Sequence, residues 1–277
     1  MRLGAPVSMR ADDLDQWAKD VQRKGYQAVY CPLNLDADEE TIREFVKIAH
    51  SNKWVVAEVG AWSNPLSPDA TERQKALEKC KKALCLADKT GARCCVNIAG
   101  SRGKKWDGPD ASDLTSETFD RIVETVRDII DDVSPTRTFY TLETMPWMYP
   151  DSVDSYLALI RAIDRNAFAV HLDIVNLINC PERYFHQDRL IDECIDKLGG
   201  LTRSVHLKDI RLQDHLTVHL DEVRPGLGGL QFPLLLRRLA RLDPDLPVML
   251  EHLESEDRYD AAANFIREVA RENQIAL

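Results

Sequence analysis

The chain has 277 residues, of which 44% are apolar, so it has the material for one large hydrophobic core. Its 36 Lys and Arg against 46 Asp and Glu give a formal net charge of −10, which argues against a nucleic-acid partner because DNA and RNA binders gather basic side chains on one face. No apolar run is long enough to span a membrane and no charged segment precedes an apolar one at the N-terminus, so we expect no membrane partner and a soluble, cytoplasmic protein.

The seven cysteines predict neither disulfides nor a thiolate zinc site. Their number is odd and no Cys-x-x-Cys pair occurs. Cys94 and Cys95 lie in an apolar stretch typical of a buried strand, where a free cysteine acts as a small hydrophobic residue.

Strand-like and helix-like stretches alternate through the first half of the chain. The helices are recognised by apolar residues at helical spacing, as at Leu14, Trp17 and Val21, and by a closing glycine such as Gly25. The predicted elements, in chain order, are strand 2–7, helix 11–24, strand 27–31, helix 38–50, strand 54–59, helix 69–89, strand 94–98 and helix 116–132.

The alternation continues through the second half. The predicted elements are strand 138–143, helix 152–164, strand 168–173, helix 189–198, strand 204–209, helix 233–241, strand 247–251 and helix 258–273. Residues 211–230 form an extra loop after the seventh strand. Each strand is thus followed by one helix.

Eight strands and eight helices in strict alternation predict parallel pairing with right-handed crossovers. This pattern favours the α/β class and a single (β/α)8 TIM barrel. An open doubly wound sheet usually carries a glycine-rich turn after its first strand, and the sequence that begins at Gly4 lacks G-x-G-x-x-G. We therefore expect a closed barrel.

Metal-ligand residue types end four consecutive predicted strands. They are Glu143, Asp173, His206 and Glu251. The carboxyl ends of barrel strands meet at one mouth, so these side chains should converge there. Any one of them alone is as readily a helix cap or a surface ion pair, but three carboxylates in one desolvated pocket repel one another without a cation. Hard oxygen ligands with one imidazole suit manganese or magnesium.

Three further polar residues are expected near this mouth. Lys208 lies two positions after His206 and points inward, either to polarise a substrate oxygen or to pair with Glu251 or Asp173. His171 lies one inward step below Asp173 and is expected to support a ligand rather than to be one. Arg224, in the extra loop, is a candidate for a substrate carboxylate or phosphate, or for pairing with Asp221.

Residues that follow strands three to five are candidates for substrate contact. The aromatic faces of Trp62, Trp106 and Trp147 suit stacking on a sugar ring, although a tryptophan in such a loop also serves as a packing lid. Glu58 and Asn97 end strands three and four and are candidates for binding hydroxyl groups, with helix capping as the alternative.

Several segments together carry a resemblance to a known family. They are Leu142-Glu-Thr-Met-Pro-Trp147, His171-Leu-Asp-Ile-Val-Asn176, His206-Leu-Lys-Asp209, Pro225-Gly-Leu-Gly-Gly-Leu230 and Leu250-Glu-His252. The chain resembles the sugar phosphate isomerase/epimerase superfamily, the xylose isomerase-like TIM barrels that include ketose 3-epimerases, inosose dehydratases and endonuclease IV. The resemblance covers nearly the whole chain and implies a single xylose isomerase-like TIM-barrel domain over residues 1–277.

The resemblance also implies an activity. It assigns Glu143, Asp173, His206 and Glu251 to a divalent metal, with Mn²⁺ expected first and Mg²⁺, Co²⁺ or Zn²⁺ as alternatives, and it makes Glu143 and Glu251 the catalytic acid/base pair. The implied enzyme is a metal-dependent isomerase or epimerase that acts on a small carbohydrate, a sugar or keto-sugar, through an enediolate.

Alternatives within the resemblance stay open. A metal-dependent dehydratase of a keto-polyol uses the same scaffold, and Asn176 stands where some ketose epimerases carry a histidine. The larger ligand set of endonuclease IV is not supplied at matching strand ends. A sugar-binding barrel without activity would leave the carboxylates idle. Relatives commonly form dimers or tetramers, so a homo-oligomer is one of the options.

Overall fold

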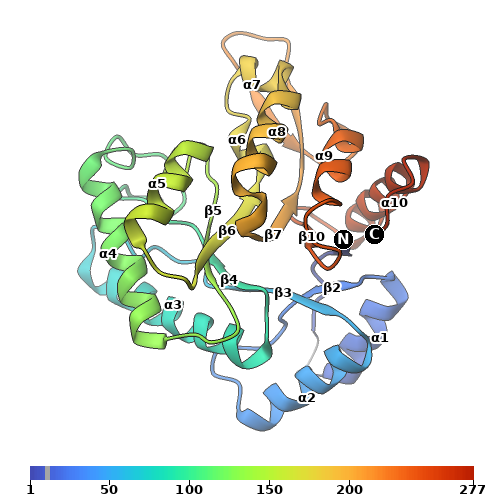
Figure 1. Ribbon diagram of the computed structural model, residues 1–277, viewed down its shortest axis with the longest axis horizontal. Helices are drawn as coiled ribbons and strands as arrows, with labels where there is room; N and C mark the ends of the chain where they lie inside the picture. The colour runs from blue at the N-terminus through green and yellow to red at the C-terminus, as the bar shows by residue number, and fades with distance from the viewer. Residues whose placement is uncertain (10–12) are drawn as a thin grey trace.

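The chain folds into a closed parallel barrel with the helices outside it (Figure 1). The computed structural model describes residues 1–9 and 13–277. Around the barrel the strands follow the order β1-β10-β7-β6-β5-β4-β3-β2, and β1 pairs with both β10 and β2. The predicted (β/α)8 barrel is confirmed. The expected start of the first helix, at 11–12, falls outside the described residues.

The barrel strands are short and mostly apolar, and every residue of β4, β5, β6 and β10 is buried. Their bounds are β1 (Arg2–Gly4), β2 (Ala28–Tyr30), β3 (Val55–Gly60), β4 (Cys94–Asn97), β5 (Tyr140–Glu143), β6 (Phe168–Asp173), β7 (Thr202–Leu207) and β10 (Pro247–Leu250). The first strand is shorter than predicted, and Pro6, which follows it, has no N–H for a ladder.

Most helices begin at a side chain that caps their free N–H groups, as Asp38 and Asp69 do. The larger helices are α1 (Leu14–Lys24), α2 (Glu39–Ser51), α3 (Ala70–Thr90), α4 (Ser116–Val133), α5 (Val153–Ile163), α8 (Gln187–Leu198), α9 (Phe232–Leu239) and α10 (Glu256–Glu272). In the part of the chain that the structure describes, no helix is both long and apolar enough to cross a membrane.

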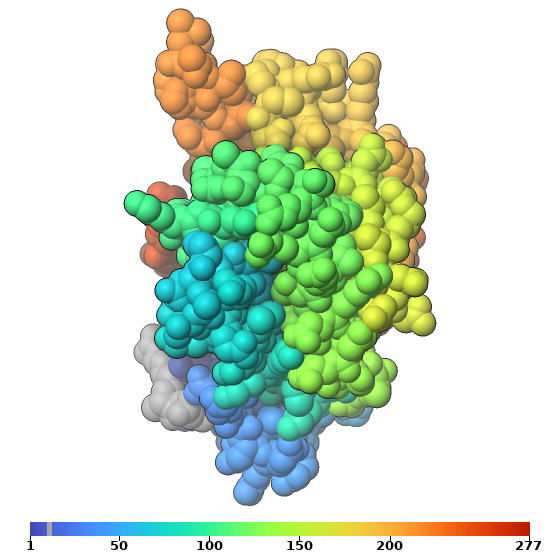
Figure 2. All heavy atoms as spheres, turned by 90° about the vertical axis from the view of Figure 1, so that its left-hand side faces the viewer, coloured from blue at the N-terminus to red at the C-terminus, as the bar shows by residue number. Residues whose placement is uncertain are grey.

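Short elements between β6 and α9 were not predicted. They are α6 (Ile174–Leu177), α7 (Pro181–Phe185), a 3-10 turn at Gly199–Leu201, β8 (Asp209–Leu212) and β9 (Leu220–Val223). The last two pair as an antiparallel hairpin, which begins at the predicted end of the seventh strand and continues into the segment 211–230 that was predicted to be a loop. The hairpin region, coloured orange, projects beyond the body of the molecule in Figure 2.

Asp209 fixes the segment that follows the hairpin. Its buried carboxylate accepts hydrogen bonds from the backbone N–H groups of Gly226 at 3.0 Å, Gly228 at 2.8 Å and Leu230 at 2.9 Å. A Cβ on Gly228 would collide with the Asp209 carboxylate and with the carbonyl oxygen of Ile210. The glycines of this segment therefore let the backbone turn around the Asp209 carboxylate, which takes the backbone N–H groups that a bound phosphate would need.

Candidate metal centre

Strands β5, β6, β7 and β10 bring the predicted ligands together at one end of the barrel. We call this set the outer cluster: Glu143, Asp173, His206 and Glu251. One ligand atom from each lies within 4.8 Å of those from the other three. The register explains part of this convergence, because Asp173 pairs with His206 across adjacent strands. Glu143 and Glu251 are 4% and 8% exposed, so the cluster reaches the surface of the barrel mouth.

Asp173 is oriented by its place at a strand-to-helix junction. It caps the short helix α6, and its Oδ1 accepts from the Asn176 N–H at 3.1 Å. The Thr144 hydroxyl donates to the Asp173 carbonyl at 2.7 Å. With one carboxylate oxygen held in this way, the other, Oδ2, is directed toward the outer cluster.

Lys208 brings a buried ammonium group into the outer cluster. It is 2% exposed, and its Nζ lies 2.6 Å from Glu251 Oε1 and 2.8 Å from Asp173 Oδ2. Glu143 and Glu222 oxygens are farther from it, at 3.7 and 3.6 Å. Lys208 thus pairs with both carboxylates that the sequence offered as alternatives, and it also lines the cavity above them.

A second cluster of side chains lies on the other side of the His206 ring from the outer cluster. This inner cluster consists of Glu58, His171 and His206. Glu58 Oε1 is 3.2 Å from His206 Nε2, and Glu58 Oε2 is 3.0 Å from His171 Nε2. The other ring nitrogen of His206, Nδ1, faces Glu251 Oε1 at 2.9 Å and Glu143 Oε1 at 3.2 Å. His206 therefore joins the two clusters.

Electrostatics keep most of these groups charged despite their burial. Burial lowers the pKa of His206, but Glu251, Glu58 and Glu143 outweigh it and hold that pKa well above the ordinary value. Burial raises the pKa of Glu58, but the two imidazoles bring it down to about 2. Burial raises the pKa of Asp173 to about 6. Asp173 is thus the carboxyl of the set that ionises least readily.

The outer cluster fits a divalent cation on the chemistry of its donors. Three carboxylates and one imidazole converge closely enough to share an ion, and among residues 1–9 and 13–277 the lysine paired with them is Lys208. Asp173 Oδ2 and Glu251 Oε1 accept no aligned hydrogen bond from the described residues, although the lysine ammonium is near both. Buried acceptors in this state are stabilised by a cation.

A cavity of about 650 Å³ opens directly above the cluster. Its floor includes Glu143, Glu251 and Lys208, and its walls include Trp62, Trp106 and Trp147, which are partly exposed. The size is within the usual range for small-molecule sites. Gly60 makes room for one wall, because a Cβ there would collide with the Trp62 indole.

Several residues expected to contact substrate lie outside this cavity. Asn97 is fully buried and its amide is bonded to the backbone of Ser63. Arg224 donates to the carbonyl of Pro225 and does not line the cavity. Glu58 and His171 are 1% and 0% exposed, and both lie against His206 beneath the cavity, as was expected for His171.

Other cavity residues were not predicted to be part of the site. Glu222 enters from β9, close to Lys208, and its Oε1 lies 3.3 Å from His252 Nδ1. Its position depends on the hairpin, which the sequence pattern did not reveal. His252 directly follows Glu251 and has φ of 54°, an unfavourable conformation for a residue with a side chain. Asn176 donates to Glu143 Oε1 at 3.2 Å. The sequence feature that could have indicated this role is its position three residues after Asp173, in the pattern Asp-x-x-Asn.

Comparison with known proteins identifies similar sequences and folds. The family model described as "Xylose isomerase-like TIM barrel" matches residues 18–269. Comparison with curated protein sequences yields no significant match.

Among solved structures, D-psicose 3-epimerase with D-tagatose from Clostridium cellulolyticum H10 is 17% identical, with a TM-score of 0.70 over 100% of both chains. The probable 3-DHS dehydratase AsbF from Bacillus anthracis is 16% identical, with a TM-score of 0.72 over 97% of this chain and 98% of that one. A xylose isomerase-like TIM barrel protein from Mycobacterium smegmatis in complex with magnesium is 15% identical, with a TM-score of 0.69 over 98% and 96%. At these identities the likeness shows the fold alone.

Proposed function

The chain belongs to the xylose isomerase-like TIM-barrel family, and from that premise we propose that it is a divalent-metal-dependent isomerase or epimerase of a sugar or keto-sugar. The observation that carries the proposal is the outer cluster, in which Glu143, Asp173, His206 and Glu251 converge under an open cavity. These four residues would hold the ion, and we take Mn²⁺ as the first candidate because oxygen ligands with one imidazole suit it.

The reaction requires a proton to leave and return at a carbon beside a carbonyl. A divalent cation in the outer cluster would make that carbon more acidic by withdrawing charge from the carbonyl. Glu143 and Glu251 both line the cavity, and the neighbouring His206 and Lys208 hold the pKa of each carboxyl below its ordinary value against the effect of burial. Both are therefore carboxylates at neutral pH, so one can remove the proton from carbon, and the other can return a proton after taking it from solvent that enters the open cavity.

The remaining cavity residues orient the substrate. Lys208 presents a buried ammonium that donates to a substrate oxygen, and Asn176 steadies Glu143. The indoles of Trp62 and Trp147 offer flat faces to a sugar ring and reduce access of water. We place a small, multiply hydroxylated carbohydrate in this cavity.

A dehydratase of a keto-polyol is the second candidate. Lys208 favours it, because an ammonium at the cavity floor can protonate a departing hydroxide that a carboxylate would repel. The first proton abstraction is the same, and the enediolate then expels a β-hydroxyl instead of being reprotonated. AsbF is a probable dehydratase on the same fold.

Solvent isotope exchange tests the proposal and separates the two candidates. Mn²⁺-loaded protein is incubated with a panel of ketoses and keto-polyols in deuterated water, and the products are followed by NMR and ultraviolet absorbance. Deuterium at the carbon beside the carbonyl indicates an isomerase or epimerase, and an absorbing enone indicates a dehydratase. Metal analysis that finds no divalent ion after supplementation would reject both.

We predict that Glu251→Gln abolishes exchange while the fold is kept. The amide cannot accept the proton, so turnover should fall by a factor of about 10² to 10⁴. Glu254→Gln is the matched control, since the Glu254 side chain is 80% exposed, three residues away. Circular dichroism checks the fold of both variants. Full activity in Glu251→Gln would remove Glu251 from the acid/base role.

A further inference from the structure

The two clusters compete for one imidazole. The outer cluster uses His206 Nδ1 and the inner cluster uses His206 Nε2, and each cluster by its composition is able to hold an ion. A neutral imidazole has one nitrogen with a lone pair and one that carries a proton. His206 can therefore ligate a cation on one side only and must donate a hydrogen bond on the other.

Charge and access decide which side takes the cation. The outer side offers three carboxylates and borders the open cavity. The inner side offers one carboxylate, Glu58, and one further imidazole, His171, which are 1% and 0% exposed. A cation on the inner side would be partnered by less charge and would have to cross the buried layer beneath the cavity.

The inner cluster is instead built to hold a proton donor in place. Glu58 on β3 uses one oxygen for His206 at 3.2 Å and the other for His171 at 3.0 Å. The two imidazole rings meet edge to face with centroids 4.1 Å apart. Glu58 Oε1 is thus hydrogen-bonded to His206 Nε2, while Glu58 Oε2 lies close to His171 Nε2 without an aligned hydrogen bond.

We propose that Glu58 is a positioning residue, which accepts the His206 Nε2–H and thereby aims the Nδ1 lone pair at the cation of the outer cluster, and that the inner cluster itself binds no ion. The inference rests on the proposed metal site. It specifies that His206 binds the cation through Nδ1, that Glu58 selects this nitrogen, and that the barrel holds one ion. His171 has the supporting role of orienting Glu58.

Metal binding without substrate tests this inference. Mn²⁺ alone is titrated into wild-type protein, Glu58→Gln, Glu58→Asp and the control Glu40→Gln, whose site on α2 is exposed, and bound ion is measured by electron paramagnetic resonance. Wild type should bind one Mn²⁺. When a metal-bound histidine loses the residue that hydrogen-bonds its other ring nitrogen, metal affinity typically falls about 10- to 100-fold. We expect a fall of this size for Glu58→Gln and a smaller one for Glu58→Asp. The control Glu40→Gln should bind Mn²⁺ as tightly as wild type.

The tautomer of His206 is a second measurement, because it would not change if Glu58 had a purely structural role. In Mg²⁺-loaded, ¹⁵N-labelled protein, the His206 proton should reside on Nε2, and Glu58→Gln should populate the other tautomer. A proton on Nδ1 in wild type would overturn the inference, and this measurement requires no variant to fold. Two Mn²⁺ per chain, or unchanged affinity and tautomer in Glu58→Gln, would also overturn it.

Failure of the proposed function looks different. If wild type binds no Mn²⁺, the metal site itself is rejected. If wild type binds Mn²⁺ and Glu58→Gln binds it equally well, the site stands and only the positioning role of Glu58 is lost.

Discussion

Lys208 sets the charge balance of the centre at the scale of single residues. Its ammonium contacts Asp173 and Glu251 through the oxygens that the outer cluster offers to a cation. Two cations that share buried oxygens repel one another strongly in a medium of low dielectric constant. Lys208 therefore acts as an internal counter-ion in the metal-free protein and opposes the incoming metal.

Substitution of this lysine should strengthen metal binding. We predict that Lys208→Met raises the affinity for Mn²⁺ by about tenfold or more, because it removes a competing charge, and lowers the thermal stability of the metal-free protein, because it leaves buried carboxylates unpaired. Titration calorimetry and thermal unfolding measure the two effects. Lys105→Met, at a cavity residue with a 72% exposed side chain, is the control. Weaker binding in Lys208→Met would contradict the competition.

Asp173 should make metal binding sensitive to pH. Burial raises its pKa to about 6, with Glu143 and Glu251 adding to the effect and Lys208 opposing it. The metal-free carboxyl therefore carries a proton below about pH 6 and must release it to bind a cation.

Lowering the pH through about 6 should consequently add up to about a tenfold loss of Mn²⁺ affinity per pH unit to the loss caused by the proton that His206 must also release. Electron paramagnetic resonance titrations between pH 5 and 8 measure this. A pH dependence that does not steepen below about pH 6 would show that Asp173 is ionised throughout.

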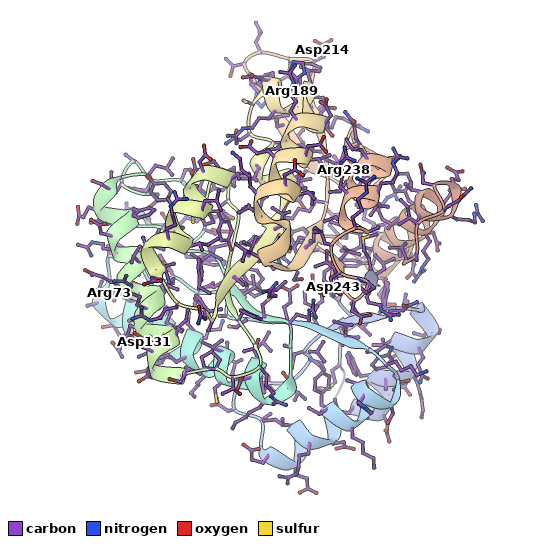
Figure 3. All side chains as sticks on the ribbon, in the orientation of Figure 1. Arg73, Asp131, Arg189, Asp214, Arg238 and Asp243 are labelled. Carbon is purple, nitrogen blue, oxygen red and sulfur yellow. The ribbon has the colours of Figure 1, made fainter. Side chains whose placement is uncertain are left out.

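The β8–β9 hairpin lies outside the barrel sheet and still contributes to the barrel mouth. It carries Glu222 to the cavity, and the segment after it is tied to Asp209 by backbone hydrogen bonds. Asp214 is exposed and lies near the outer tip of the projecting hairpin region (Figure 3). The anchor and the tip should therefore respond differently to substitution.

We predict that Asp209→Ala lowers the free energy of unfolding by about 3 kcal/mol or more, because several buried N–H groups lose a charged acceptor. Asp214→Ala should change it by less than about 0.5 kcal/mol, as is usual for an exposed position. Urea denaturation measures both. Equal effects at the two positions would show that the Asp209 hydrogen bonds do not stabilise the segment.

The regular elements could be predicted from the sequence, whereas the insertions could not. Apolar periodicity and capping residues such as Asp69 and Gly91 give the barrel strands and helices to within a few residues. The hairpin was missed because both strands are only four residues long: Asp209–Leu212 alternates over just two apolar positions, and Leu220–Val223 is apolar only at its two ends. The helices α6 and α7 are too short to show a period.

The candidate ligands were predictable for a related reason. Strand ends in a barrel converge whatever the details of packing, so residue type and position at Glu143 or Glu251 were enough to bring them together. The roles of Glu58 and Asn97 depend on which face of the strand end each side chain takes. Glu58 points beneath His206, and Asn97 points to the Ser63 backbone. Sequence pattern alone did not separate those two orientations.

The whole molecule should be stabilised by the ion, since the outer cluster joins strands from the β5-to-β10 half of the barrel. Ligand binding to the folded state alone adds about 2.7 kcal/mol at a concentration one hundred times Kd. We predict that Mn²⁺ at that excess raises Tm by about 5 °C. A chelator should reverse the shift, and Glu251→Gln should reduce it. Calorimetric scans with and without Mn²⁺ measure these changes, and no shift in wild type would argue against the site.

The arrangement of the ligands has a consequence for how such a barrel can diversify. All four come from the second half of the chain, while loops of the first half supply the indoles of Trp62 and Trp106. New selectivity can therefore arise from altered loops in one half without disturbing the ion-binding strands of the other. A protein engineer seeking to change what the cavity accepts would randomise those early loops first and leave β5, β6, β7 and β10 untouched.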